Sequence, residues 1–250
     1  MSKSGFCKVS VANLIKEPSH SAERHSQLLF GEQVEILSDN DQSYWAEISI
    51  PTIKERAWVL RSQIEETHQE IISSGIVYGN QGILNMQNDV MPTLSGMIIN
   101  EVYNKNIHHA IITKAADNLK NDEFKFKILM SYLGAPYSWG GLTVFGIDCS
   151  GLSKIFYRFM GILLPHEATL QIDYGTSVDF LQNTQMGDLA FFVNESEMIH
   201  HVGIMLNEHQ IIHASESNGV VAIDEIDIEG IIQHHSHKRT HKLKLIKRLI

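Results

Sequence analysis

The sequence predicts an α+β protein, with strands in the N-terminal part, helices in the middle and an antiparallel sheet at the end. Two observations indicate this fold class. Residues from about 6 to 65 alternate short β-rich runs with turn residues and contain little helical periodicity. Helical periodicity appears from about residue 119, and strand-like runs return at residue 189. Helices followed by an antiparallel sheet are an α+β layout.

Residues 1–65 are predicted to form a small all-β barrel. Closely spaced short strands with little helix between them favour that architecture. Turn residues separate the β-rich runs. The runs are residues 33–37, 44–48 and 57–59, with Val9 and Val11, and the turn signals are residues 17–19, Gly31, residues 39–41 and Pro51.

Residues 66–118 leave two alternatives open, a second small β unit (SH3-like, if it repeats the first) or a long connection. Residues 75–79 and 97–99 are the strand candidates, and Gly82, Pro92 and Gly96 interrupt them. The predicted domain boundaries are therefore 1–65, 66–118 and 119–250.

Residues 119–250 are predicted to form helices and then a sheet. Apolar residues recur at helical spacing between Phe124 and Tyr132, and Pro136 ends that helix because proline cannot continue it. A second helix begins at Cys149 and ends at Gly161, and a third begins near residues 166–168. Strands are predicted at residues 189–193, 201–206, 210–214, 220–223 and 242–249.

The formal net charge of −9 over 250 residues argues against nonspecific binding to nucleic acid or anionic lipid. The longest apolar stretches are short and interrupted, so no transmembrane helix is expected. The N-terminal residues lack the apolar core of a signal peptide, so we expect a cytoplasmic protein. An exported protein trimmed of its leader would look similar, and that alternative stays open.

The chain has two cysteines and fourteen histidines. Cys7 and Cys149 do not make a disulfide framework, so Cys7 is expected to be a free thiol. Four histidines cluster at residues 234–241, ending with His241, where a mixed run before a basic strand is more often solvated surface than a metal site. We therefore expect no metal and no cofactor.

Cys149 is the candidate nucleophile because it begins a predicted amphipathic helix. Leu152, Ile155, Phe156 and Phe159 follow it at helical spacing and form one apolar face. A thiol at a helix N-terminus lies beside unpaired backbone N–H groups and the positive end of the helix dipole. Both favour the thiolate, so we expect an activated cysteine.

His201 and His213 lie on neighbouring predicted strands, and the length of the loop between the strands decides whether they share a face of the sheet. If the hairpin loop has three residues, Gly203 pairs with His213, and His201 lies one diagonal step away on the same face, whereas His200 points to the other face. A two-residue loop would put His201 and His213 on opposite faces. The first register gives Cys149 as nucleophile, His201 as general base and His213 as the group that orients His201. Taken singly, each histidine is more often structural than catalytic.

Asp148, directly before the nucleophile, has two interpretations. As an N-cap it would accept a backbone N–H bond at the start of the helix. At the mouth of the site it would pair with a substrate ammonium, because a carboxylate beside a thiolate needs a cation to offset it. Ser150 is a second cap or a substrate contact. Tyr137 and Trp139 lie in an aromatic, glycine-rich loop that could shape a pocket, although Trp139 fits the core equally well.

Six short motifs occur in order in the C-terminal half. They are YSWGG (137–141), DCSG (148–151), LP (164–165), GDLAFF (187–192), HVGI (201–204) and IHAS (212–215). Together they make residues from about 119 to 250 resemble the NlpC/P60 family of bacterial cell-wall cysteine peptidases. The resemblance implies a papain-like α+β core with the cysteine helix packed on an antiparallel sheet. It gives Cys149 the role of nucleophile, His201 that of general base and His213 that of the orienting third residue.

The N-terminal part resembles the bacterial SH3 domains that precede this catalytic domain in the YkfC-like branch of the family. The matching stretches are residues 18–20, Glu23, residues 27–32 and residues 57–59. This resemblance implies a γ-D-glutamyl-L-diamino-acid endopeptidase that acts on peptidoglycan peptides with a free N-terminal L-alanine. It also implies that Asp148, Ser150 and Tyr137 help to bind the substrate, with Glu23 contributed by the SH3 domain.

Two departures from the family pattern bear on substrate recognition. Where the family usually has LPRDA, this chain has His166 and Glu167 in LPHEA and so lacks the arginine fork. Near Trp58, where the branch commonly carries a substrate-facing tyrosine, the chain has Glu55 and Arg56. Both changes concern recognition of the substrate N-terminus rather than the catalytic chemistry.

The predicted function is hydrolysis of the amide between γ-D-glutamate and an L-diamino acid in wall-derived peptides, as part of murein peptide recycling. Three alternatives stay open: a secreted wall hydrolase acting on intact stem peptides, a wall-binding protein with an inactive peptidase domain, and an acyltransferase acting on lipid. The peptide substrate is the expected partner, without nucleic acid or membrane insertion. The preferred diamino acid and the oligomeric state stay open.

Overall fold

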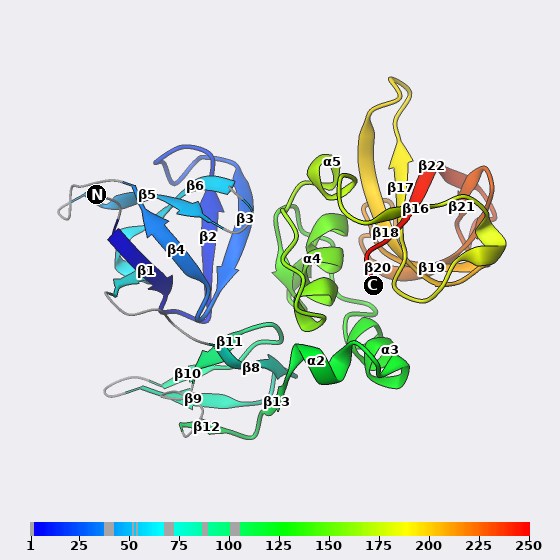
Figure 1. The fold of residues 1–250 in the computed structure, drawn as a ribbon. Coiled ribbons are helices and arrows are strands. Elements are labelled where there is room, and N and C mark those ends of the chain that lie inside the picture. The colour runs from blue at the N-terminus through cyan, green and yellow to red at the C-terminus, as the bar shows by residue number, and fades with distance from the viewer. Residues whose placement is uncertain are drawn as a thin grey trace. The chain divides into compact units, whose positions relative to one another are not determined.

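The structure is a computed structural model that describes residues 3–37, 43–51, 53, 55–67, 73–86, 90–100 and 106–250. The chain divides into two compact units, Met1–Asp117 and Asn118–Ile250 (Figure 1). The turn predicted at residues 39–41 lies outside the described residues.

Seven strands of the first unit form one antiparallel sheet in the order β3-β2-β6-β5-β4-β1-β7. Buried side chains alternate along them, as in β5, where Ala46, Ile48 and Ile50 are buried. They form one apolar core that includes the buried thiol of Cys7, which is in no disulfide as predicted, and the predicted small β-barrel is confirmed. The strands are β1 (Lys3–Cys7), β2 (Val11–Ile15), β3 (Arg24–Leu29), β4 (Gln33–Ile36), β5 (Trp45–Ile50), β6 (Glu55–Leu60) and β7 (Ile64–Glu66), with the 3₁₀ turn η1 (Arg61–Gln63) before β7.

The stretch after the barrel forms two small antiparallel sheets, β10-β9-β12 and β11-β8-β13. Val77 and Ile99 are fully buried in the second of these sheets. The N–H of Ile98 donates to the carbonyl oxygen of Phe30 at 3.0 Å, which ties the stretch to the barrel. Its strands are β8 (Ser73–Tyr78), β9 (Ile83–Asn85), β10 (Val90–Pro92), β11 (Ile98–Asn100), β12 (Ile107–His108) and β13 (Ile111–Thr113).

Helices and a short hairpin lead to the nucleophile in the second unit. α3 (Asp122–Met130) is capped by Asn121, whose side chain accepts the N–H of Phe124 at 2.9 Å. α4 (Cys149–Phe159) is capped by Asp148 and ends before Gly161, whose φ of +80° favours glycine. These two helices are confirmed, whereas the third, α5 (Ala168–Gln171), is a single turn. The remaining elements are α2 (Ala115–Asn118), β14 (Leu142–Thr143), β15 (Gly146–Ile147) and η2 (Leu181–Asn183).

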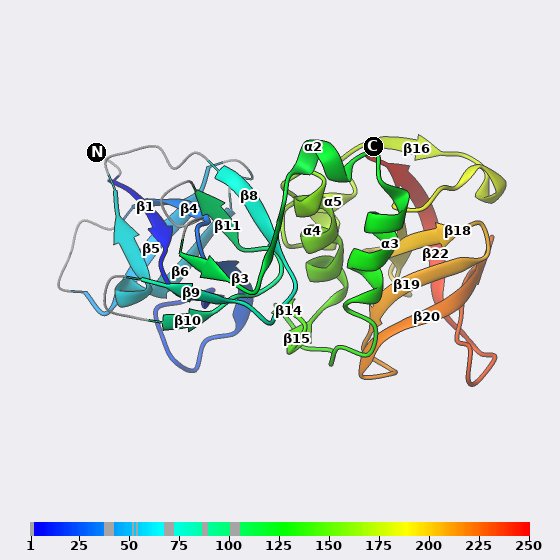
Figure 2. The ribbon, with the colours of Figure 1, turned by 90° about the horizontal axis from the view of Figure 1, so that it is seen from below.

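A second seven-stranded antiparallel sheet follows, in the order β16-β22-β17-β18-β19-β20-β21. β22 also pairs with β21, so the sheet closes around buried side chains such as Phe192, Met205 and Ile211. α4 packs against β18 and β19, so the expected packing of the cysteine helix on an antiparallel sheet is confirmed (Figure 2). The strands are β16 (Thr176–Val178), β17 (Leu189–Val193), β18 (Ile199–Asn207), β19 (Gln210–Ser215), β20 (Val220–Asp227), β21 (Gly230–Ile232) and β22 (Arg239–Arg248), of which β16 and β21 were not predicted.

Candidate active site

The hairpin of β18 and β19 brings His201 and His213 to one face of the sheet. Ile204 pairs with Ile212, which is the predicted register, and this places His201 one diagonal step from His213. The loop itself differs from the predicted three-residue loop. It is a two-residue turn, and a bulge at Leu206 shifts the pairing back into the predicted register.

Asp224 extends the two histidines into a buried line of three side chains. His201 Nε2 lies 2.8 Å from His213 Nδ1, and His213 Nε2 lies 3.0 Å from Asp224 Oδ2. All three side chains are at most 5% exposed. The sequence analysis missed Asp224, although the same pairing argument would find it. His213 pairs with Ala222 across β19 and β20, so Asp224 lies one diagonal step away on the same face.

Backbone N–H groups surround the sulfur of Cys149. Because α4 packs against β18, the N–H of Val202 is hydrogen-bonded to the thiol, together with the N–H groups of Cys149 and Ser150 at the start of the helix. Gly151 permits this close arrangement, since a Cβ there would lie 2.2 Å from the carbonyl oxygen of Gly141. The glycine-rich loop and the helix start therefore pack directly on each other.

The predicted thiolate is wrong for the free protein. Burial, followed by the charge of Asp148, raises the pKa of the Cys149 thiol to about 12. The surrounding N–H groups lower this pKa, as expected from a helix N-terminus, but by less. The expectation counted the helix dipole and left out the cost of burying a charge. Cys149 is therefore a thiol at neutral pH and needs a base to become a nucleophile.

His201 is suited to be that base. Burial, followed by the neighbouring His213, His241 and His200, lowers the pKa of His201 well below the usual value for histidine. The imidazole is therefore neutral at physiological pH and can accept a proton. A thiol next to a neutral imidazole is the starting state for general-base catalysis.

His241 belongs to the site and not to the solvated surface that the sequence predicted for it. The centroid of its ring lies 4.2 Å from that of His201 and 5.7 Å from that of His213. Burial, followed by His213 and His200, lowers the pKa of His241 to about 4. The prediction was wrong because β22 pairs with β17 and β21 and so turns this residue inward, while the other three histidines of the cluster are exposed.

Asp148 caps α4, and its carboxylate is occupied by donors from the protein. Oδ1 accepts the N–H of Gly151 at 2.7 Å, and Oδ2 accepts the N–H of Gly140 at 2.7 Å and pairs with His166 Nε2 at 2.9 Å. Burial alone would raise the pKa of Asp148, but His166 and the two N–H groups lower it. The predicted contact with a substrate ammonium would therefore require one of these partners to move.

Ser150 and Tyr137 lie beside the nucleophile. The hydroxyl of Ser150 donates to Asp148 Oδ1 at 3.3 Å, as a second cap would. Burial of the half-buried phenol of Tyr137, followed by the charges of Cys149 and Asp148, raises its pKa. Trp139 is 57% exposed, so its alternative assignment to the core is wrong.

The segment after α4 is fastened to the start of that helix. Gln171 Nε2 donates to the carbonyl oxygens of Ser150 and Pro165 at 3.0 and 2.8 Å. His166, which stands where the resembling family has arginine, is buried and is held against Asp148. Glu167 is exposed and accepts a hydrogen bond from Thr169 at 3.3 Å. The missing arginine fork is thus replaced by one imidazole contact to Asp148.

Glu23 and Glu55 lie in the first unit. Glu23 forms an ion pair with Lys16 at 2.8 Å, and both side chains are about half exposed. Glu55 begins β6 and is buried. The part of Glu23 in substrate binding stays a prediction.

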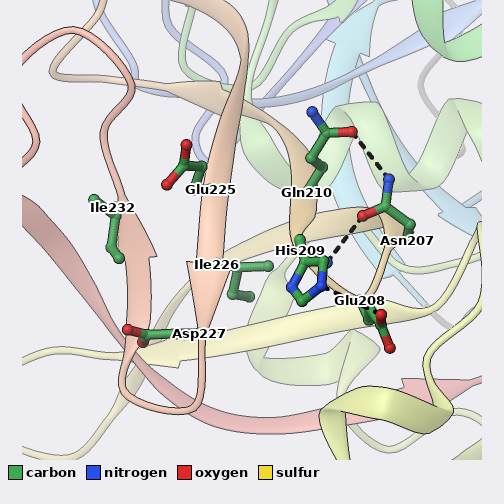
Figure 3. Close-up of a pocket in the computed structure, with 8 residues that line it drawn as sticks. All are labelled: Asn207, Glu208, His209, Gln210, Glu225, Ile226, Asp227 and Ile232. Carbon is green, nitrogen blue, oxygen red and sulfur yellow. Dashed lines mark hydrogen bonds and ion pairs between the residues drawn. The ribbon is translucent and has the colours of Figure 1, made fainter.

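A surface hollow at the tip of the β18–β19 hairpin contains none of the predicted site residues (Figure 3). It is lined by residues 207–210 and by Glu225 and Asp227 of β20, and the side chain of Asn207 donates to that of Gln210 at 2.9 Å. Among the described residues, no three His, Cys, Asp or Glu side chains are grouped to bind a metal. No helix in the described part of the chain has the length and apolar character needed to cross a membrane.

Comparison with known proteins relates both units to bacterial peptidases. Residues 134–241 match the NlpC/P60 family, and residues 14–64 match the bacterial dipeptidyl-peptidase Sh3 domain. A γ-D-glutamyl-L-lysine dipeptidyl-peptidase of Bacillus subtilis (strain 168) is 26% identical over 79% of this chain and 74% of its own length. Its Bacillus cereus (strain ATCC 10987) counterpart is 33% identical over 52% of this chain, which spans only 38% of that relative. An NlpC/P60 family protein structure from Bacillus cereus ATCC 10987 has the same fold, with a TM-score of 0.75, 17% identity and coverage of 98% and 99% of the two chains.

Proposed function

We propose, from the NlpC/P60 domain and the bacterial SH3 domain that this chain carries, that the protein is a cysteine endopeptidase acting on peptidoglycan-derived peptides. The bond it hydrolyses is the amide between γ-D-glutamate and an L-diamino acid. The observation that supports this best is the buried line from His201 through His213 to Asp224, which begins one residue before Val202, whose N–H is hydrogen-bonded to the Cys149 thiol. The names of the relatives from both Bacillus species point to the same class of bond.

The first half of the reaction forms an acyl-enzyme. The sulfur of Cys149 attacks the γ-carbonyl carbon of D-glutamate while Nδ1 of His201 takes the thiol proton. The negative charge that develops on the carbonyl oxygen needs hydrogen-bond donors, and the backbone N–H of Cys149 at the helix start is suited to supply one. His201 then gives the proton to the departing amine of the diamino acid, and the C–N bond breaks.

The second half releases the first product. A water molecule gives one proton to His201, and its oxygen attacks the thioester carbonyl. The C–S bond breaks, the proton returns to Cys149, and a dipeptide with a free γ-carboxylate leaves. The buried and neutral state of His201 allows the same imidazole to serve as base in each half.

Substrate recognition is the second part of the proposal. A free N-terminal ammonium on L-alanine needs a carboxylate partner, and Asp148 and Glu23 are the predicted partners, with Tyr137 and Ser150 at the site wall. For Asp148 to serve, His166 or a backbone N–H has to give up its contact with that carboxylate. The roles of these residues in substrate binding can therefore be tested separately from the roles of Cys149 and His201 in catalysis.

The decisive experiment is mass-spectrometric cleavage of L-Ala-γ-D-Glu-L-Lys and L-Ala-γ-D-Glu-diaminopimelate, each with a free and an acetylated N-terminus. We expect release of L-Ala-D-Glu from the free peptides only. Cleavage of acetylated peptides as well would move the enzyme toward intact stem peptides and remove the ammonium requirement.

Two cysteine variants control the experiment. Cys149→Ala should abolish cleavage, whereas Cys7→Ala should keep it, because Cys7 is a buried thiol of the barrel core. A folded wild-type protein that cleaves none of the four peptides would contradict the proposed substrate.

A further inference from the structure

Asp224 is a buried carboxylate that ends the line of His201 and His213, and His201 directly precedes Val202, whose N–H is hydrogen-bonded to the Cys149 thiol. We propose that Asp224 is a positioning residue that fixes the tautomers of both His213 and His201, so that Nδ1 of His201 is left free to accept the thiol proton. The proposal deepens the proposed function and rests on it. Two hydrogen bonds, from His201 to His213 and from His213 to Asp224, relay the position of the protons from the carboxylate to the base.

The charge of Asp224 determines which nitrogen of His213 carries a proton. Burial alone would raise the pKa of Asp224, but the hydrogen bonds from His213 and from the N–H of His234 lower it, so Asp224 is an anion. A carboxylate can only accept, so the 3.0 Å contact requires the proton to be on His213 Nε2.

The remaining protons follow in order. An imidazole that carries one proton, on Nε2, has a lone pair on Nδ1, so the proposal has His201 Nε2 donate to His213 Nδ1 across the 2.8 Å contact. A neutral His201 with its proton on Nε2 has a lone pair on Nδ1. The anion two rings away thereby selects the nitrogen that acts as the base.

The second oxygen of Asp224 explains why an aspartate, and not an asparagine, is needed at this position. Oδ1 accepts the backbone N–H of His234 at 2.9 Å, so both carboxylate oxygens face donors. An asparagine would have to keep its carbonyl oxygen toward His234 and turn its NH₂ toward His213. His213 Nε2 would then accept, His213 Nδ1 would donate, and the proton of His201 would move to Nδ1, toward the sulfur.

The same carboxylate also supports the charged state. When His201 takes the thiol proton it becomes an imidazolium in a site where burial opposes positive charge. Asp224 is 3% exposed, so its negative charge is little screened by water and offsets the new charge through His213. A positioning role therefore predicts an effect on kcat rather than on KM.

The test combines kinetics with a direct reading of the tautomers in the full chain. In wild-type protein, ¹⁵N NMR of the histidine rings should show His201 and His213 both protonated on Nε2. Asp224→Asn should shift both protons to Nδ1 and lower kcat by about 10²–10⁴-fold with KM nearly unchanged, as loss of correct base orientation does elsewhere. Thermal unfolding should stay within a few degrees of the wild type.

A substrate-free measurement separates this proposal from the proposed function. Alkylation of Cys149 by iodoacetamide near neutral pH needs the same base and no peptide, so Asp224→Asn should slow it even if the natural substrate differs. Asp173→Asn, at an exposed aspartate, is the matched control. The proposal is overturned if wild-type His201 carries its proton on Nδ1, a result that needs no variant to fold. It is equally overturned if Asp224→Asn keeps kcat and alkylation within about threefold of wild type.

Discussion

The second unit contains two buried histidine–aspartate pairs with nearly the same N–O distance and different links to Cys149. On the sheet, His213 and Asp224 are 3.0 Å apart; at the start of α4, His166 and Asp148 are 2.9 Å apart. All four residues are at most 4% exposed. The sheet pair acts on the base through His201, whereas the charge of Asp148 acts on the thiol directly and raises its pKa.

The difference shows that such a pair takes its role from what else the aspartate binds. Asp148 also accepts the N–H groups of Gly140 and Gly151, so it holds the glycine-rich loop and the helix together. The second oxygen of Asp224 accepts only the backbone N–H of His234 among the contacts described. We therefore expect the helix pair to control stability and the sheet pair to control the rate.

The largest expected effect comes from removing His201, the imidazole that is hydrogen-bonded to the His213–Asp224 pair. His201→Ala leaves a thiol of high pKa without a base, so kcat/KM should fall by at least about 10²–10⁴-fold. Its matched control is His200→Ala, the exposed neighbour on the same strand, which should keep kcat/KM within a few-fold. Peptide cleavage by both variants checks this, and comparable losses in the two would remove His201 from its role.

The second effect breaks the helix pair. Asp148→Ala removes the cap of α4 and leaves buried donors without an acceptor, which should destabilise the second unit by about 3 kcal/mol. That corresponds to a decrease in Tm of roughly 10 °C. The pKa of Cys149 should fall at the same time, because a charge that raises it is gone.

Calorimetry and the pH dependence of iodoacetamide alkylation test the two halves of that prediction. Asp173→Ala, at an exposed aspartate, is the stability control. A variant that keeps its Tm but loses its activity would mean that Asp148 serves the substrate rather than the helix.

The third effect comes from replacing His166, the partner of Asp148, with a side chain that can still donate a hydrogen bond. His166→Gln keeps an N–H that can donate to Asp148 but cannot carry charge. Because His166 lowers the pKa of Asp148, the stability gained from that carboxylate is present above its unfolded pKa and is lost as the pH falls through its folded pKa. The glutamine raises the folded pKa, so acid unfolding should begin at higher pH. Circular dichroism through an acid titration checks this, with the exposed His209→Gln as control, and an unchanged midpoint would contradict it.

The sequence predicted the sheet side of the site better than the helix side. Periodicity and motif order predicted α4, β18 and β19, and with them a shared face for His201 and His213. The loop length was wrong, but the bulge at Leu206 restores the predicted pairing of Ile204 with Ile212.

The remainder depends on contacts between residues that are far apart in the sequence. The raised pKa of Cys149 comes first from burial, which no local pattern around the cysteine reveals. His166 lies 18 residues from Asp148, and only the folded segment after α4 brings them together. Asp224 differs from these, because the pairing of His213 with Ala222 places it on the same face as His213, one diagonal step away.

The smallest expected effect concerns His241, which touches the sheet line without joining its hydrogen bonds. Its ring lies against His201 and lowers the pKa of that base. His241→Phe should therefore raise the pKa of His201. Because the base must be unprotonated, kcat/KM rises with pH through that pKa, so the acid limb of the profile should move to higher pH while the plateau stays nearly level.

The pH profile of peptide cleavage measures the shift, and His235→Phe, at an exposed histidine of the same cluster, should leave it in place. An acid limb that moves to lower pH would mean that His241 stabilises the imidazolium, which would make it a second supporting group beside His213. An acid limb that moves up, with the tautomers of His201 unchanged, would assign the choice of nitrogen to Asp224 and the pKa of that nitrogen to the packing around it.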